Sequence, residues 1–431
     1  MVDFWVKFHG DILPALADSI IARMFKNKNL SVLFFTLVVV MLGFGIVIPI
    51  LPFYVEHFGG SGKDMGMLMA IYSIMQFIFS PIWGSLSDHY GRKPILLIGI
   101  IGNVVSQILY GLVGDFAEAG MFTPQASLTL LIVTRGLAGI LSSATLPTAM
   151  AIISDSTSHH ERGGGMGLVG AAMGVGMVLG PGIGGMMSGI SLSAPFYFAA
   201  AISVIAVILT WAMVSESLPK EERSVTLGKI NGPQFGQMWR ELFGPMGFLL
   251  FLAFLYNFAL ANFESVFGMY TQLRYDYNAT QVGIVLTVVG LVSAVVQGVL
   301  TGPATRKWGD SLVVKASLFA SIFGFVMMTM SKSQPGKISA SVMLAAGFFM
   351  LFNSMLRPGV SSLISKQDNM SQGMAMGMNN AFMSLGRIVG PLWAGYALDI
   401  NLNYPYLTGA FIMAVGFMLT LFFLPKTELV K

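Results

Sequence analysis

The sequence predicts an all-α membrane protein of twelve transmembrane helices arranged as two pseudo-symmetric bundles of six. The first observation is composition: hydrophobic residues make up 55% of the 431 residues and charged residues only 10%, where a soluble domain carries about 25% charged residues. The second is a glycine–proline pattern that occurs twice. Gly167, Gly176, Gly180, Pro181, Gly184 and Gly185 are matched, 210 positions later, by Gly377, Gly386, Gly390, Pro391, Ala394 and Gly395. Internal repeats of this kind are typical of secondary transporters, which place a binding site near the bilayer midplane.

Twelve apolar runs have lengths near the ~20 residues that cross a bilayer. They lie at 31–54, 65–84, 95–114, 127–151, 164–190, 195–215, 246–271, 281–302, 312–331, 339–363, 373–397 and 404–424. An even number of spans places both termini on the same side of the membrane.

Positive charge orients the spans. With the termini inside, 17 of the 24 Lys and Arg residues lie on the cytoplasmic side and 4 on the outer side, with 3 inside spans; this obeys the positive-inside rule. We therefore expect a multi-pass protein of the plasma membrane with both termini cytoplasmic. The predicted segments are a cytoplasmic amphipathic stretch at 1–30, for which a disordered tail is the alternative, a first bundle at 31–215, a linker at 216–245, a second bundle at 246–425 and a tail at 426–431.

The loop after the second span contains Gly84, Asp88, Gly91, Arg92 and Lys93. Asp88 and Arg92 place opposite charges one helical turn apart near helix ends, so the loop is predicted to act as a conformational latch. The spacing resembles the G-x-L-x-D-x-x-G-R-K signature of the major facilitator superfamily. The second half carries a degenerate copy with the charges in reverse order, formed by Gly302, Arg306, Gly309 and Asp310; chance is the alternative explanation.

Three further patterns resemble the drug/proton antiporter branch of that superfamily. Span one holds a Gly- and Pro-rich stretch, span four holds Arg135, and span five holds a glycine motif that, by the resemblance, marks exporters. The motif residues are Gly176, Gly180, Pro181, Gly184 and Gly185. The resemblance implies that Arg135 takes part in proton coupling; an architectural hydrogen-bonding role is the alternative.

Four ionisable residues lie well within spans: Arg135, Glu264, Arg357 and Arg387. Each costs ~2.5–3.5 kcal/mol at a helix centre, so they are expected to face a wet cavity or one another. Burial favours the protonated form of an acid and a nearby cation favours its ionised form. Glu264 is therefore predicted to exchange a proton for a positively charged substrate, with a static salt bridge to an arginine as the alternative. For Arg357 and Arg387 a structural role is favoured.

Two departures from related antiporters bear on the coupling. Span one lacks a central acid, and Asn353-Ser354 stand where the resemblance implies a second carboxylate, so Glu264 is left to act alone. The predicted substrate cavity is adaptable because the chain has 31 methionines. Its candidate residues are Gln76, Phe77, Asn257, Phe263, Phe267, Asn379, Asn380, Arg357 and Arg387.

The sequence also excludes several kinds of reaction and binding site. The absence of cysteine excludes disulfides and thiol catalysis. A lookalike of the phosphate loop at Gly59–Lys63 lacks the required residues, and no metal site or other cofactor is expected. We predict a transporter, not an enzyme, that exports amphipathic cationic or neutral compounds in exchange for protons. Its partners are a small-molecule substrate, protons and the lipid bilayer, with no nucleic acid, and it is expected to be a monomer. The alternatives are a facilitator or symporter for a sugar or organic anion, and a lipid scramblase.

Overall fold

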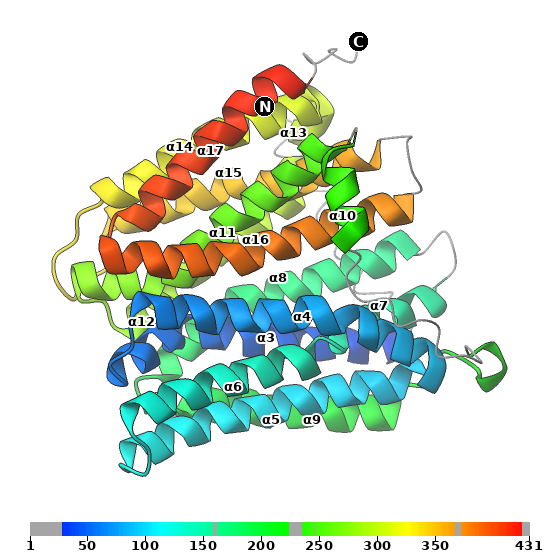
Figure 1. The fold of residues 1–431 in the computed structure, drawn as a ribbon. Helices are drawn as coiled ribbons and strands as arrows, with labels where there is room; N and C mark the ends of the chain where they lie inside the picture. The colour runs from blue at the N-terminus through cyan, green and yellow to red at the C-terminus, as the bar shows by residue number, and fades with distance from the viewer. Residues whose placement is uncertain (1–27, 158–161, 224–234, 245, 367–371, 425–431) are drawn as a thin grey trace, which may run out of the picture.

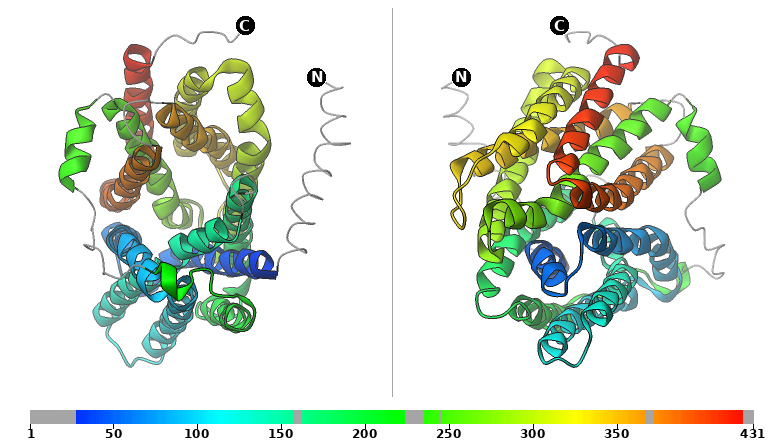
Figure 2. Two further views of the ribbon diagram at one scale, coloured as in Figure 1. Left: turned by 90° about the vertical axis from the view of Figure 1, so that its right-hand side faces the viewer. Right: turned by 60° about the vertical axis from the view of Figure 1, so that its left-hand side comes forward.

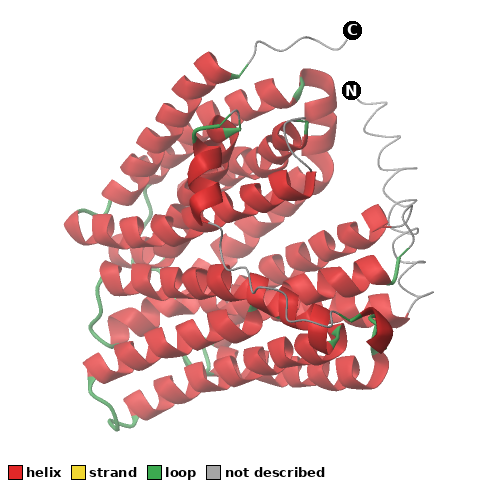
Figure 3. Ribbon diagram, turned by 45° about the vertical axis from the view of Figure 1, so that its right-hand side comes forward, coloured by secondary structure: helices red, strands yellow, loops and turns green. Residues whose placement is uncertain are grey.

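The computed structural model describes residues 28–157, 162–223, 235–244, 246–366 and 372–424, and this part of the chain is helical with no strand (Figure 3). The first half comprises α3 (Lys28–His57), α4 (Gly62–Tyr90), α5 (Arg92–Glu118), α6 (Pro124–Ser142), α7 (Thr145–Asp155), α8 (Arg162–Met187) and α9 (Ala194–Met213). Between the halves lie η2 (Lys220–Glu222) and α10 (Phe235–Leu242). The second half comprises α11 (Gly247–Tyr275), α12 (Ala279–Val295), the π-helical turn η3 (Val296–Leu300), α13 (Thr301–Trp308), α14 (Asp310–Met330), α15 (Ala340–Ser365), α16 (Gln372–Ile400) and α17 (Tyr404–Phe423).

The predicted spans agree closely with these helices. Span four is α6 followed by α7, and span eight is α12, η3 and α13 in succession. Eleven of the spans are long and apolar enough to cross a membrane. The twelfth, α16, has 29 residues but is less apolar because it carries polar side chains, Asn379, Asn380 and Arg387 among them. The predicted segments at 1–30 and 426–431 and part of the linker lie almost entirely outside the described residues.

Local sequence sets several helix boundaries. Pro124 begins α6, and the Thr123 hydroxyl oxygen accepts the Ala126 backbone N–H at 3.3 Å, so a free amide of the first turn is satisfied. Asn278 and Gln281 form a reciprocal capping box at the start of α12. Between α4 and α5 the backbone of Gly91 has φ +105°, a conformation that favours glycine. The chain can therefore reverse there within one residue.

The two halves form two layers of helices, α3 to α9 in one and α11 to α17 in the other (Figure 1). Within the halves, α3 packs on α8 and α11 packs on α16, which are equivalent pairs under the sequence repeat. Across the halves, α4 packs on α16 and α8 packs on α12. These two inter-half contacts frame the site.

The bundle has two ends, which we name by their loops. The proximal end carries the turn at Gly91 and the segment between the halves, and it faces the viewer in the left panel of Figure 2. The distal end carries the connections at 58–61, 188–193 and 331–339.

Candidate functional site

The duplicated glycine motif uses one of its faces to hold each half together. A Cβ added at Gly176 would lie 2.8 Å from the Leu42 nitrogen of α3, and one added at Gly180 would lie 2.7 Å from the Cα of Gly45. In the second half, Gly386 packs in the same way against the backbone of α11, where an added Cβ would lie 2.7 Å from the Phe258 nitrogen. Small residues let membrane helices approach this closely. This face therefore fixes α8 to α3 and α16 to α11.

The other face of each motif closes the distal end between the halves. An added Cβ at Gly185 would lie 2.7 Å from the Ala279 carbonyl oxygen, and one at Gly283 would lie 3.0 Å from the Gly185 Cα. On the opposite side, an added Cβ at Gly395 would lie 3.1 Å from the Gly66 Cα. We call these two contacts, α8 with α12 and α4 with α16, the distal gate.

Hydrogen bonds across the halves support the distal gate. The Asp399 carboxylate at the end of α16 accepts the backbone N–H of Gly62 at 2.6 Å and that of Lys63 at 3.0 Å. It thereby caps the N-terminus of α4, where negative charge is favoured. On the α8 side, the Thr280 hydroxyl donates to the Gly185 carbonyl oxygen at 2.6 Å. The sequence analysis did not single out Asp399; nothing in its local sequence shows that its partners are more than 330 residues away.

Toward the proximal end the same helices are not packed against each other. No heavy atom outside the local helix lies within 4 Å of a Cβ added at Gly84 of α4, Gly174 of α8, Gly298 in η3 or Gly377 of α16. Close contacts of the glycine motifs between the halves are therefore found at the distal end, and nothing in the described part of the chain packs on these four glycines.

A pocket lies between these two regions, and both halves line it. We call it the central pocket; its lining residues are Phe44, Met69, Tyr72, Ser73 and Arg135 from the first half and Ala261, Glu264, Arg387 and Pro391 from the second. The volume open to the centres of water molecules is about 40 Å³, where one water needs roughly 10–15 Å³. In this conformation the pocket has room for a few waters between three charged side chains.

Arg135 is buried, with a relative exposure of 2%. Its guanidinium carbon lies 4.7 Å from the centre of the Tyr72 ring and 5.6 Å from that of Phe44, and one terminal nitrogen contacts the Met69 sulfur at 3.7 Å. The Nε atom is buried with no hydrogen-bond partner. Aromatic rings stabilise such a cation only partly, so the Nε atom keeps unused hydrogen-bonding capacity. Arg135 lines a second small pocket inside the first half as well as the central pocket.

Glu264 is half-buried in α11, and Arg387 is exposed in α16; both line the central pocket. Among the described residues, four ion pairs have a nitrogen–oxygen distance within 4.0 Å, and none includes Glu264, Arg387, Arg357 or Arg135. The static salt bridge that was the alternative role for Glu264 is thus not formed in this conformation.

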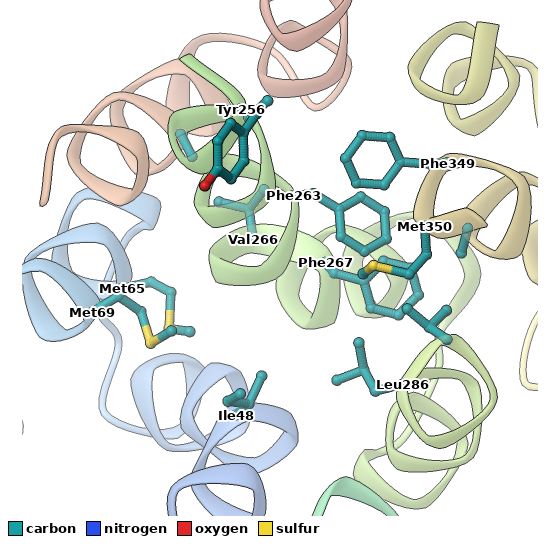
Figure 4. Packing of buried hydrophobic residues seen from close by; sticks show 14 of the residues in the cluster. Ile48, Met65, Met69, Tyr256, Phe263, Val266, Phe267, Leu286, Phe349 and Met350 are labelled. Carbon is teal, nitrogen blue, oxygen red and sulfur yellow. The ribbon is translucent and has the colours of Figure 1, made fainter. Parts of the chain in front are cut away.

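The other predicted cavity residues lie in different surroundings. Figure 4 shows Phe263 and Phe267 pointing toward Phe349 and Met350 of α15, and Phe263 stacks with its ring centre 4.8 Å from that of Phe349. These two phenylalanines belong to the large hydrophobic cluster to which both halves contribute. Gln76 and Phe77 are half-buried on α4, and Asn380 and Arg357 are exposed. Asn257 and Asn379 are buried. The Asn257 amide donates to the Ala253 carbonyl oxygen of its own helix, and the Asn379 amide donates to the Ser361 hydroxyl oxygen. None of these lines the central pocket.

The latch residues form a network at the proximal end, within the first half and the segment after it. Arg92 forms an ion pair with Asp88, one turn away, and its Nε lies 3.3 Å from the Asp155 carboxylate. The Glu216 carboxylate accepts the backbone N–H groups of Arg92 at 2.9 Å and Lys93 at 3.2 Å. Sequence reasoning missed Asp155 and Glu216, since both lie far from the loop in the chain.

The degenerate copy in the second half also forms an ion pair, with different partners from those predicted. Asp310, which occupies the position of Arg92, accepts from the Lys366 ammonium group and from the Ser362 hydroxyl, each at 2.6 Å. Arg306 has no recorded ion pair among the described residues. Lys366 directly follows the last residue of α15, and Asp155 is the last residue of α7, so the charges of the two equivalent pairs are exchanged.

Comparison with known proteins agrees with this architecture. The family model of the Major Facilitator Superfamily matches residues 33–367 and 279–431. The chain belongs to the major facilitator superfamily. Multidrug resistance protein 1 of Bacillus subtilis (strain 168) is 33% identical over 397 residues, which are 92% of this chain and 96% of that protein. The quinolone resistance protein NorA of Staphylococcus aureus is 27% identical over 396 residues, with the same coverage.

Among solved structures, a mutant of the nucleoside transporter NupG superposes with a TM-score of 0.74 at 14% identity, covering 92% of this chain and all of NupG. That similarity shows the fold. As a member of the major facilitator superfamily, the protein is a multi-pass membrane transporter of small molecules, not an enzyme, and its sequence relatives place it in the drug/proton antiporter branch.

Proposed function

We propose that this protein exports amphipathic compounds in exchange for protons by alternating access, with Glu264 as the proton-coupling group. The observation that carries the proposal is the central pocket, where the one acid, Glu264, lies with Arg135 and Arg387 between the two halves, which are in close contact at the distal gate. Relatives named for multidrug and quinolone resistance support export.

The orientation of the protein follows from its charge. The proximal end carries the excess of Lys and Arg, so we place it and both termini in the cytoplasm of a cell with the protein in its plasma membrane as a monomer. The conformation with the distal gate closed then opens inward, ready to take up substrate. Opening of the distal gate and closure of the proximal side would expose the same pocket to the outside.

The proton gradient supplies enough free energy. One pH unit contributes ~1.4 kcal/mol, and 100 mV contributes ~2.3 kcal/mol per charge. One proton per cycle sustains a gradient of roughly a few hundredfold for a substrate without net charge, and of about tenfold for a monovalent cation, because exchange of such a cation for a proton moves no net charge. A single coupling carboxylate is therefore sufficient.

The test is dye transport into proteoliposomes with an imposed pH gradient. Wild type is expected to move dye only with the gradient, and Glu264→Gln is expected to bind dye and lose the gradient dependence. Glu56→Gln is the matched control, because Glu56 is exposed at the distal end of α3 and should couple normally. Transport that ignores the gradient, or normal coupling by Glu264→Gln, would overturn the proposal in favour of a facilitator.

A further inference from the structure

The second pocket, inside the first half, is separate from the one between the halves. It lies among α3, α4, α5 and α6, and we call it the inner pocket. Phe44, Tyr72 and Arg135 line both it and the central pocket, so these three side chains form the border between the two. The volume open to the centres of water molecules is about 20 Å³, where one water needs roughly 10–15 Å³. The inner pocket therefore has room for a single water.

Three polar groups that line the inner pocket are buried without a hydrogen-bond partner among the described residues. They are Nε of Arg135, the hydroxyl of Tyr110 and Oε1 of Gln107, and the three residues are 2%, 1% and 3% exposed. Leaving such groups unsatisfied away from water destabilises a folded protein. Cavities that stay empty are apolar, whereas polar ones hold water. The lining of the inner pocket therefore calls for a bound molecule.

Packing fixes the positions of these three groups. The Gln107 amide nitrogen donates to the Gly43 carbonyl oxygen of α3 at 3.0 Å. The reverse orientation of the amide would set two oxygens against each other, so Oε1 is the atom left without a partner. The Tyr110 ring packs on Phe196 with the ring centres 5.3 Å apart, which leaves its hydroxyl free only to rotate. Tyr110 and Arg135 interact electrostatically, yet no hydrogen bond of Tyr110 is formed.

We infer that the inner pocket binds one water molecule, which links Arg135, Tyr110 and Gln107. The water accepts the Arg135 Nε–H and donates to Gln107 Oε1, and it pairs with the Tyr110 hydroxyl, which can donate or accept. Buried waters typically make about three hydrogen bonds, the number offered here. A small anion such as chloride would accept from Arg135 and Tyr110 but would be repelled by the Gln107 oxygen. The mixture of donors and acceptor thus selects water.

The water supplies, from inside the first half, the hydrogen bond that Arg135 lacks. All residues that line the inner pocket belong to that half, whereas the lining of the central pocket is divided between the halves. The water should therefore stay bound whichever end of the transporter is open. Water binding here does not require proton exchange at Glu264, so failure of one leaves the other standing.

Two tyrosines of the first half form a matched pair for the test. Tyr54 and Tyr110 are each 1% exposed and their rings both pack on Phe196, but the Tyr54 hydroxyl bonds directly to that of Ser193 at 3.0 Å. Thermal unfolding is measured with purified protein in detergent. Tyr110→Phe should lower the melting temperature about as much as Tyr54→Phe, by about 1–2 °C, because each variant loses a buried hydroxyl that is hydrogen-bonded. If the pocket were dry, removal of the unsatisfied Tyr110 hydroxyl would leave the melting temperature unchanged or raise it, and that result would overturn the inference.

X-ray hydroxyl-radical labelling of the wild-type protein gives a second reading that needs no variant. Irradiation converts bound water into hydroxyl radicals, which add oxygen to the nearest side chain, and mass spectrometry locates the product. Tyr110 is expected to be labelled several times faster than Tyr54, whose hydroxyl is bonded to protein. Equal labelling of the two tyrosines would show that no water is bound beside Tyr110.

A change of salt distinguishes water from an anion in the inner pocket. Replacement of chloride by gluconate at constant ionic strength should leave the melting temperature of wild type unchanged. A lower melting temperature in gluconate for wild type, but not for Tyr110→Phe, would show that the inner pocket binds chloride and would overturn the assignment of water.

Discussion

Replacing Asp399 by Asn should shift the transporter away from the conformation with the distal gate closed. Asp399 accepts two backbone N–H groups of α4 across the interface between the halves, and these bonds break whenever the distal end opens. Asparagine keeps one neutral acceptor and removes the negative charge from the helix N-terminus. Asp399 is exposed, so we take the loss at about 1 kcal/mol, within the range for charges at helix ends and exposed ion pairs. The ratio of open to closed distal gates should then rise about fivefold.

The assay measures the distance between the two halves at the distal end. Because the chain has no cysteine, spin labels can be attached to cysteines introduced at Met121 and Gln334, which are exposed in distal connections of the first and second halves. Double electron–electron resonance should show a larger population at long distance for Asp399→Asn than for wild type. Label positions and background are otherwise identical.

Asp64→Asn supplies a matched control at the same helix end. The Asp64 carboxylate accepts the Ser61 backbone N–H at 2.7 Å, but both residues belong to one half, so this bond is kept whichever end of the transporter is open. Asp64→Asn should lower thermal stability and leave the distance distribution unchanged. If Asp399→Asn gives the wild-type distribution, or if Asp64→Asn shifts it equally, the reasoning about the distal gate is refuted.

Two further changes test other contacts. Gly283→Val should hold the distal gate open, because even a Cβ there would lie 3.0 Å from the Gly185 Cα. The same spin labels should then show mainly the long distance. A closed distal gate in that variant would contradict the packing argument. Glu216→Gln should weaken the cap on the N-terminus of α5 and the ion pair with Arg223 at 3.6 Å. Limited trypsin digestion should then cleave after Arg223 faster than in wild type. An unchanged cleavage rate would show that Glu216 does not restrain this segment.

The sequence predicted the fold well because the membrane imposes a simple rule. A helix must be about 20 residues long and apolar to cross a bilayer, and each predicted span coincides with an observed helix or with consecutive helical segments. The repeat also identified the equivalent helices. Even α16, which is less apolar than the other spans, was predicted as an apolar run at 373–397, and its glycine motif matches that of α8.

The site was predicted only in part. Glu264, Arg135 and Arg387 were recognised because charge within a span is costly, and the structure brings all three to one pocket. Phe263 and Phe267 are close to Glu264 in the sequence and were predicted to line the substrate cavity. Neighbouring residues of a helix nevertheless point to different sides of it. The side of α11 that carries them packs on α15. Partners such as Asp399 depend on the packing of distant segments, which a sequence without related sequences does not reveal.

The two faces of the glycine motif make different contacts, one within each half and one between the halves. Within a half, α8 packs on α3 and α16 packs on α11 through glycines spaced four residues apart, and these contacts adjoin large buried cores. Between the halves, the same motifs meet α12 and α4 mainly through backbone, with few hydrogen bonds. We therefore expect substitutions on the two faces to differ. A larger residue on the face within a half should impair folding, and one on the face between the halves should shift the conformational equilibrium.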